Sequence, residues 1–227
     1  YRTAGVSALA AKYLARKESK CMALIGTGAQ GEFQSLAFDA VFGLDSIRYY
    51  DIDQAAMEKY ETNMMGFEIK LVPCGSVDEA LDGADIITTA TADKKRAVIL
   101  KDSMLKDGVH VNGIGGDCPG KTELEQESVK RAKVVVEFLE QTEVEGEIQT
   151  LGSDAVYAEL WEIVGGNKKG RESDSELTLF DSVGFAIEDY SVLNYVFRLA
   201  TEFEIGTDMA LIPEPDDPKN LFGIFKK

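Results

Sequence analysis

Short apolar runs alternate with amphipathic stretches along the first half of the chain. The apolar runs are bounded by glycine or polar residues and predict strands at 22–25, 47–50, 67–72, 86–89 and 109–114. The amphipathic stretches between them predict helices at 32–42, 53–65 and 76–81. Asp53 and Ser76 suit helix starts because their side-chain oxygens can accept from backbone N–H groups, and Gly43 suits a helix end.

Apolar positions extend this pattern toward both ends of the chain. A helix is predicted over 1–18, with an apolar face formed by Val6, Leu9, Ala10, Tyr13 and Leu14. Further strands are predicted at 134–138 and 177–180, and a last helix at 186–203. This alternation of strands and helices predicts an α/β fold with a doubly wound, Rossmann-type parallel sheet and right-handed crossovers.

The residues between the later strands are mostly polar. An acidic run predicts a solvated face and consists of Glu140, Glu143, Glu145 and Glu147. Residues 165–174 are rich in Gly, Lys and Ser and predict an irregular connection, and the proline-rich tail at 213–218 is predicted to be extended. No internal repeat is visible.

Composition excludes several classes of protein. The 227 residues are 44% hydrophobic and 28% charged, as in a soluble globular protein, and the net charge of −16 disfavours nucleic acid and anionic membranes as partners. No apolar run approaches the about 20 residues that a membrane helix needs. The three cysteines are scattered along the chain, which indicates reduced thiols in a cytoplasm. With only one histidine besides them, the composition predicts no metal site.

The first candidate site is a glycine-rich loop after the first predicted strand. Gly26, Gly28 and Gly31 form the pattern G-x-G-x-x-G between a strand and a helix, which is typical of a dinucleotide-binding turn. Asp51 ends the next strand, where a carboxylate can accept from ribose hydroxyls and repels a 2′-phosphate. The sequence therefore predicts NAD rather than NADP as the cofactor.

The second candidate site is the turn that follows the strand at 109–114. Asp117, Pro119 and Lys121 stand within five positions, after Gly115 and Gly116. Glycines allow close approach of the backbone to a ligand, and ligands of open α/β sheets bind at the carboxyl ends of the strands. An ordinary turn, with Asp117 or Thr122 capping a helix, explains the same residues.

Five separated segments resemble the ornithine cyclodeaminase/mu-crystallin family. They are Tyr1-Arg2-Thr3-Ala4 before an alanine-rich helix, the loop 26–31 with Gln30, Thr88-Thr89-Ala90-Thr91, the turn within 111–123 and Asp181-Ser182-Val183-Gly184. The sequence Gly-Gly-Asp-Cys-Pro-Gly-Lys-Thr-Glu is more similar to cyclodeaminase-like members than to mu-crystallin or alanine dehydrogenase-like ones.

The resemblance implies roles for individual residues. Asp117 would be the acid/base, Arg2 would bind the substrate carboxylate with its planar guanidinium, and Val183 would contact the substrate. The residues implied to line the cofactor, besides the three glycines, are Ala29, Gln30, Asp51, Thr91, Val111, Asn112, Gly113, Ile114, Lys121 and Ser182. Without the resemblance, Lys121 would be interpreted as a solvated lysine, Arg2 as a surface arginine and Val183 as a core residue.

The resemblance also implies a reaction. Family members called ornithine cyclodeaminases use NAD to convert L-ornithine to L-proline and ammonia, through oxidation to an imine, ring closure and return of the hydride. A ketimine reductase or an amino-acid dehydrogenase on the same scaffold is the enzymatic alternative. A non-catalytic, mu-crystallin-like dinucleotide-binding protein is the alternative from another class.

Domain organisation follows from the same resemblance. Because the chain begins at Tyr1, within a predicted helix, we expect a truncated protein whose substrate and dimerisation domain is mostly absent. Residues 1–18 would enter from that domain, 19–184 would form the NAD-binding domain, and 185–227 would pack toward the absent domain. The family implies a homodimer and an amino-acid substrate.

Overall fold

The computed structural model describes residues 1–92 and 97–209, and the predicted tail at 213–218 lies outside them. The chain divides into two compact units, Tyr1–Glu188 and Asp189–Lys227. The first unit contains the sheet and both candidate sites. No helix of the described part is long and apolar enough to span a membrane.

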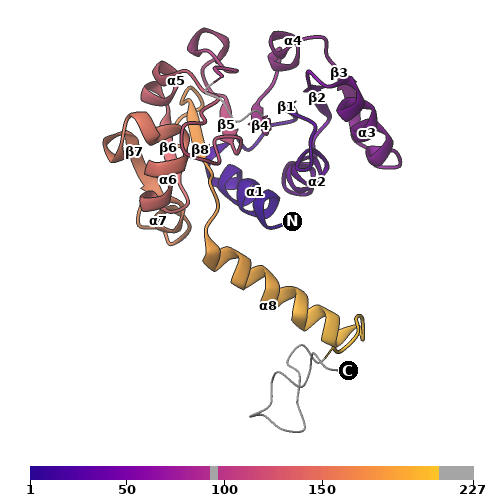
Figure 1. Ribbon diagram of the computed structural model, residues 1–227. Coiled ribbons are helices and arrows are strands. Elements are labelled where there is room, and N and C mark those ends of the chain that lie inside the picture. Colours follow the sequence, from indigo (N-terminus) through magenta and orange to yellow (C-terminus); the bar gives the residue numbers. More distant parts are fainter. Residues whose placement is uncertain (93–96, 210–227) are drawn as a thin grey trace, which may run out of the picture. The chain divides into compact units, whose positions relative to one another are not determined.

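Within the described residues, eight parallel strands form one sheet in the order β3-β2-β1-β4-β5-β8-β6-β7 (Figure 1). The strands are β1 Cys21–Ile25, β2 Ser46–Tyr50, β3 Lys70–Pro73, β4 Ile86–Thr89, β5 His110–Gly113, β6 Lys133–Val136, β7 Val156–Glu159 and β8 Thr178–Asp181. The chain order reverses between β1 and β4, so their carboxyl ends form the crevice where doubly wound sheets bind ligands. The predicted fold class is confirmed.

Helices cover the sheet because its central strands are apolar on both faces. They are α1 Arg2–Leu14, α2 Gly31–Phe42, α3 Gln54–Met64, α4 Val77–Leu81, α5 Gln126–Arg131, α6 Leu139–Glu145, α7 Leu160–Val164 and α8 Ala186–Glu202, with short 3-10 turns at Asp102–Met104, Glu147–Thr150 and Ser153–Ala155. As predicted, the side chains of Asp53 and Ser76 accept from the first turns of α3 and α4. Gly43 ends α2 in the left-handed conformation that glycine favours.

Several elements differ from the predictions. α1 ends at Leu14 rather than at residue 18, and Leu9, placed on its apolar face by the sequence pattern, is 40% exposed. β7 was missed because this four-residue edge strand has only one buried residue. The solvated face predicted for the acidic run is wrong for Glu147, which is 2% exposed, although Glu140 is exposed.

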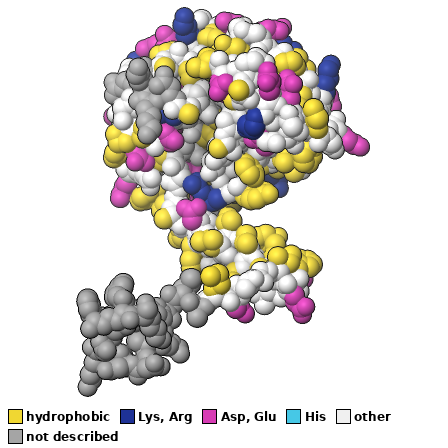
Figure 2. Space-filling view, turned by 45° about the vertical axis from the view of Figure 1, so that its right-hand side comes forward, with side chains coloured by type: hydrophobic (Ala, Val, Ile, Leu, Met, Phe, Trp, Pro, Cys, Tyr) yellow, Lys and Arg dark blue, Asp and Glu magenta, His cyan; other side chains and the backbone are white. Residues whose placement is uncertain are grey.

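α1 packs as part of the first unit. Its Val6, Ala10 and Leu14 share a buried cluster with Val135 and Phe180 of the sheet. α8 differs, because none of its residues is buried. Its exposed apolar side chains include Tyr190, Leu193 and Phe197, and Figure 2 shows yellow apolar side chains gathered on this helix.

Candidate functional site

The glycines of the β1–α2 loop serve three different purposes. Gly26 has φ +98°, and a Cβ there would lie 2.6 Å from the carbonyl oxygen of Ala90, so only glycine fits between the two loops. Gly31 packs α2 against the neighbouring helix, since its Cβ would lie 3.3 Å from the ring of Tyr60. A Cβ at Gly28 would meet nothing within 4 Å, which leaves open space beside the loop.

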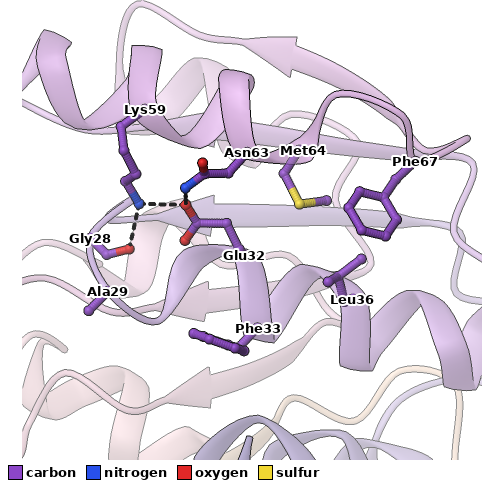
Figure 3. A pocket seen from close by; sticks show the side chains of 9 residues that line it. All are labelled: Gly28, Ala29, Glu32, Phe33, Leu36, Lys59, Asn63, Met64 and Phe67. Carbon is purple, nitrogen blue, oxygen red and sulfur yellow. Dashed lines mark hydrogen bonds and ion pairs between the residues drawn. The ribbon is translucent and has the colours of Figure 1, made fainter.

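The N-terminus of α2 begins directly after this loop. Gln30 precedes the helix without a capping side-chain hydrogen bond, and the N–H of Gly31 donates to the carbonyl oxygen of Gly28 at 3.2 Å. The positive end of the helix dipole therefore lies beside the loop, where it favours an anion. Lys59 of α3 donates to the loop, with Nζ 2.8 Å from the carbonyl oxygen of Thr27 and 3.0 Å from that of Gly28. The same Nζ lies 2.7 Å from Glu32 (Figure 3).

A hollow of about 580 Å³ lies between α2 and α3 beside this loop (Figure 3). Its apolar lining is Ala29, Phe33, Leu36, Met64 and Phe67. Its polar lining is already paired, because Glu32 accepts from both Lys59 and Asn63 at 2.7 Å. The hollow therefore offers mainly apolar surface, on the side of the loop that Lys59 occupies.

Asp51 joins the end of β2 to the glycine loop. One carboxylate oxygen accepts from the backbone N–H of Thr27 at 2.7 Å, and the other from that of Asp53 at 3.0 Å. The side chain is only partly buried. The structure thus brings the predicted acid beside the predicted loop, as the sequence spacing suggested.

The turn after β5 pairs an exposed acid with a buried base. Lys121 Nζ donates to the carbonyl oxygen of Thr91 at 2.7 Å and lies 3.2 Å from Asp117 Oδ1. The Lys121 side chain is 3% exposed and that of Asp117 is 61% exposed, so the interpretation of Lys121 as a solvated lysine is wrong. Neither Asp117 nor Thr122 caps a helix, since α5 begins after Glu125.

The end of β5 places a polar residue in the middle of the sheet. Asn112 is fully buried and donates to Gln34 at 3.3 Å and to Thr88 at 3.4 Å. Its Oδ1 and the Oε1 of Gln30 are buried and have no hydrogen-bond partner among the described residues. Because buried acceptors in proteins are normally hydrogen-bonded, these two oxygens fit a ligand that donates hydrogen bonds. Val111, by contrast, belongs to the hydrophobic core.

The segment after β8 meets the N-terminus of the chain. Ser182 donates to Glu137 at 2.9 Å, and the N–H of Gly184 donates to the same carboxylate. Arg2 lies against Gly184, where a Cβ would be 2.9 Å from Nη2, and its Nη1 is 3.5 Å from Glu188. Arg2, Ser182 and Val183 are therefore brought together from opposite ends of the chain, although Arg2 would be taken from sequence alone as a surface residue.

Sequence reasoning assigned no role to four buried carboxyl groups beneath these loops. Glu123, Glu137, Glu147 and Asp181 are at most 5% exposed. Burial raises the pKa of all four, that of Glu147 to about 8 and that of Asp181 to about 7. Glu123 could have been found from its place in the motif after Lys121, but no pattern distinguishes Glu147 from its acidic neighbours.

A doubly wound parallel sheet, a glycine-rich loop after β1 and an acid at the end of β2 define a dinucleotide-binding α/β protein. The chain belongs to the ornithine cyclodeaminase/mu-crystallin family, whose family model matches residues 1–203.

Individual relatives refine this result. The chain is 53% identical over 223 residues to an ornithine cyclodeaminase of Agrobacterium fabrum, covering 98% of this chain and 63% of the relative. Among solved structures, an archaeal alanine dehydrogenase dimer with bound NAD has a TM-score of 0.85 at 36% identity, over 92% of this chain and 66% of that one. A lysine cyclodeaminase, studied for recognition of L-lysine, L-ornithine and L-2,4-diaminobutyric acid, has a TM-score of 0.85 at 30% identity, over 97% and 64%.

Proposed function

We propose that this chain carries the NAD-binding and acid/base part of an ornithine cyclodeaminase, which converts L-ornithine to L-proline and ammonia. The observation that carries the proposal is the pairing of exposed Asp117 with buried Lys121 at the carboxyl end of β5. The Agrobacterium relative supports ornithine as the substrate. Because the chain spans 63% of that relative, the activity belongs to a polypeptide of the relatives' full length.

The site fits NAD on features of its own. Gly28 leaves open space at the uncapped N-terminus of α2, which suits a pyrophosphate. The buried oxygens of Gln30 and Asn112 are acceptors suited to hydroxyl or amide donors, which this cofactor carries. The Asp51 carboxylate would repel the 2′-phosphate of NADP. When bound, NAD supplies reversible two-electron oxidation of the substrate carbon.

We assign the remaining residues by the same reasoning. The cofactor would contact Gly26, Gly28, Ala29, Gln30, Gly31, Asp51, Thr91, Asn112, Gly113, Ile114, Lys121 and Ser182. Val111 would contribute through its backbone in β5, because its side chain lies in the hydrophobic core.

Asp117 performs the proton transfers in this proposal. The ring closure moves protons among two amines and a leaving ammonia, and a carboxylate open to the substrate can accept and return them. Lys121 holds the carboxylate at 3.2 Å and supplies the opposite charge. Arg2 binds the substrate carboxylate in competition with Glu188, and Val183 packs against the substrate.

The proposal extends to the assembly. We propose a homodimer, in which the apolar face of α8 packs against the substrate and dimerisation domain. We also propose that the NAD-binding domain comprises residues 19–184. The three cysteines are all free thiols, which suits a cytoplasmic location.

A product assay separates this function from its rivals. L-Ornithine and catalytic amounts of NAD are incubated with the polypeptide of the relatives' full length, and proline, ammonia and reduced cofactor are measured. A cyclodeaminase accumulates proline and ammonia without net reduced cofactor. A ketimine reductase or an amino-acid dehydrogenase instead oxidises or reduces one cofactor for each substrate converted, and the likeness to alanine dehydrogenase is the observation that favours this alternative. A mu-crystallin-like binding protein yields neither proline nor ammonia.

A further inference from the structure

Residues 145–149, which comprise the end of α6 and most of the 3-10 turn Glu147–Thr150, lie against the turn that carries Asp117 and Lys121. We call residues 115–124 the Asp117 turn. Gln149 contacts its middle, because Oε1 accepts from the N–H of Gly120 at 2.7 Å and Nε2 donates to the carbonyl oxygen of Lys121 at 2.8 Å. These two bonds hold the backbone on either side of the peptide bond between Gly120 and Lys121.

Glu147 holds the end of the same turn. Its two carboxylate oxygens accept from the N–H of Glu123 at 2.9 and 3.1 Å, and Oε2 accepts from the N–H of Leu124 at 3.0 Å. Glu123 in turn accepts from the N–H and the hydroxyl of Thr91, the residue whose carbonyl oxygen receives Lys121 Nζ. Glu147 therefore supports, through Glu123, the residue that accepts from the buried lysine.

Glycines make room for these carboxylates. A Cβ at Gly116 would lie 2.7 Å from Glu147 Oε1, and one at Gly115 would overlap the carboxylate of Glu123. A side chain at either glycine would therefore displace the carboxylate beneath the turn. This explains why the Gly-Gly-Asp sequence occurs here without any positive φ at Gly115 or Gly116.

We propose that Glu147 and Gln149 are positioning residues that fix the Asp117 turn, so that Lys121 stays buried against Thr91 and Asp117 faces the substrate. A buried carboxylate costs free energy, and Asp181 and Glu123 add repulsion at this position. An apolar side chain would fill the space without that cost but could accept none of the N–H groups. The effect of this positioning on turnover rests on the proposed function, whereas its effect on the turn does not.

The test compares Glu147→Gln and Gln149→Ala with matched variants on α6, Glu140→Gln and Gln141→Ala. Glu140 is exposed, and among the described residues the side chain of Gln141 donates within its own helix, to Glu145 at 3.2 Å. Amide hydrogen exchange over 118–124 and acetylation of Lys121 are followed by mass spectrometry in the whole chain. We expect both rates to rise about tenfold in the Glu147 and Gln149 variants and to stay unchanged in the controls, with exchange in β1 and β4 unaltered.

Activity in the polypeptide of full length provides the second measurement. We expect kcat for L-ornithine to fall about tenfold or more in both variants with KM changed less than twofold, since Asp117 is displaced but not removed. Unchanged exchange and acetylation in Gln149→Ala, the variant with the more exposed side chain, would overturn the inference. Faster exchange in the two variants, together with a wild-type protein that neither binds NAD nor turns over ornithine, would leave the positioning intact and refute the proposed function.

Discussion

Asp117 is the residue on which the proposed chemistry depends. Replacement by Asn keeps the shape and the contact with Lys121 but removes the ability to accept a proton. We expect Asp117→Asn to lower turnover of L-ornithine by a factor of about 10² to 10⁴, while the Kd for NAD stays within about twofold. Steady-state kinetics and calorimetry measure the two effects. Turnover that survives the substitution would show that another group carries the protons.

Gly26 and Gly28 lie in one loop but have different roles, the first in stability and the second in cofactor binding. Gly26→Ala places a Cβ 2.6 Å from the Ala90 carbonyl at φ +98°, so we expect a loss of about 1–3 kcal/mol in urea denaturation. Gly28→Ala meets no protein atom within 4 Å and should unfold like the wild type. Its methyl group would nevertheless weaken NAD binding. Equal stability losses in both variants would contradict these separate roles.

The sequence was informative for residues whose type reveals their task. The glycine pattern and the acid at the end of the next strand predicted one cofactor site, and the structure places Asp51 against Thr27 of that loop. It was uninformative for Glu147 and for the burial of Lys121. Burial of a charged side chain depends on which segment folds over it, and neighbouring residues carry no signal of that contact.

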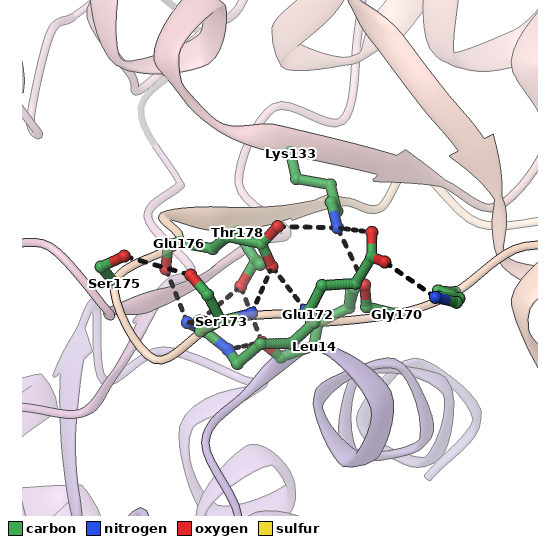
Figure 4. Close-up of polar contacts among 10 residues, drawn as sticks. Leu14, Lys133, Gly170, Glu172, Ser173, Ser175, Glu176 and Thr178 are labelled. Carbon is green, nitrogen blue, oxygen red and sulfur yellow. Dashed lines mark hydrogen bonds and ion pairs between the residues drawn. The ribbon is translucent and has the colours of Figure 1, made fainter.

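The segment between α7 and β8 contacts the amino ends of the inner strands β8 and β6 (Figure 4). Arg171 donates to the carbonyl oxygens of Leu14 and Glu176, both at 2.6 Å, and to Thr178 at 3.1 Å. Lys133 donates to Gly170 at 3.0 Å and pairs with Glu176 at 2.9 Å. These contacts bind α1, β6 and β8 to a stretch that contains no helix or strand.

We therefore expect Arg171→Ala to destabilise the protein by about 2–4 kcal/mol, because the partly buried carbonyl oxygens lose their donor. Lys169→Ala, at a side chain that is 80% exposed, should change the free energy of unfolding by less than about 0.5 kcal/mol. Urea denaturation measures both. NAD affinity should remain unchanged in each variant, and a weakened affinity in Arg171→Ala would contradict a purely structural role.

Elements were predictable where their pattern was long or fully apolar. β1, β2, β4 and α2 lie within one residue of their predicted bounds at every end. The helices α5, α6 and α7, of five to seven residues, were missed. They span too few turns for apolar periodicity to emerge, and their position is set by packing on the sheet.

Buried titratable groups make the stability of the first unit depend on pH in two opposite ways. Burial and the charge of Arg171 lower the pKa of His110 to about 3. Below about pH 6.5 the unfolded chain takes up a proton at this histidine and the folded chain does not, so the free energy of unfolding falls as the pH drops. Burial raises the pKa of Glu147 to about 8. Because this carboxyl ionises near pH 4.5 when unfolded, its contribution is lost as the pH rises from about 4.5 to 8.

Glu147→Gln tests the second effect. Glutamine cannot ionise, so the stability of the variant relative to the wild type should rise between pH 5 and pH 8, by at most about 1.4 kcal/mol per pH unit. Free energies of unfolding from urea titrations at several pH values give this difference. His110→Gln should show the opposite trend, a relative gain on acidification. A difference that does not vary with pH would show that Glu147 is ionised in the folded protein throughout.

Titration of the whole chain with NAD and with NADP by calorimetry tests most directly whether the β1–α2 loop, Asp51 and the Asp117 turn form a cofactor site. We predict saturable binding of one NAD per chain, clearly tighter than that of NADP and weakened in Gly28→Ala. Absence of NAD binding by a folded chain, or tighter binding of NADP, would contradict the assignment of this site.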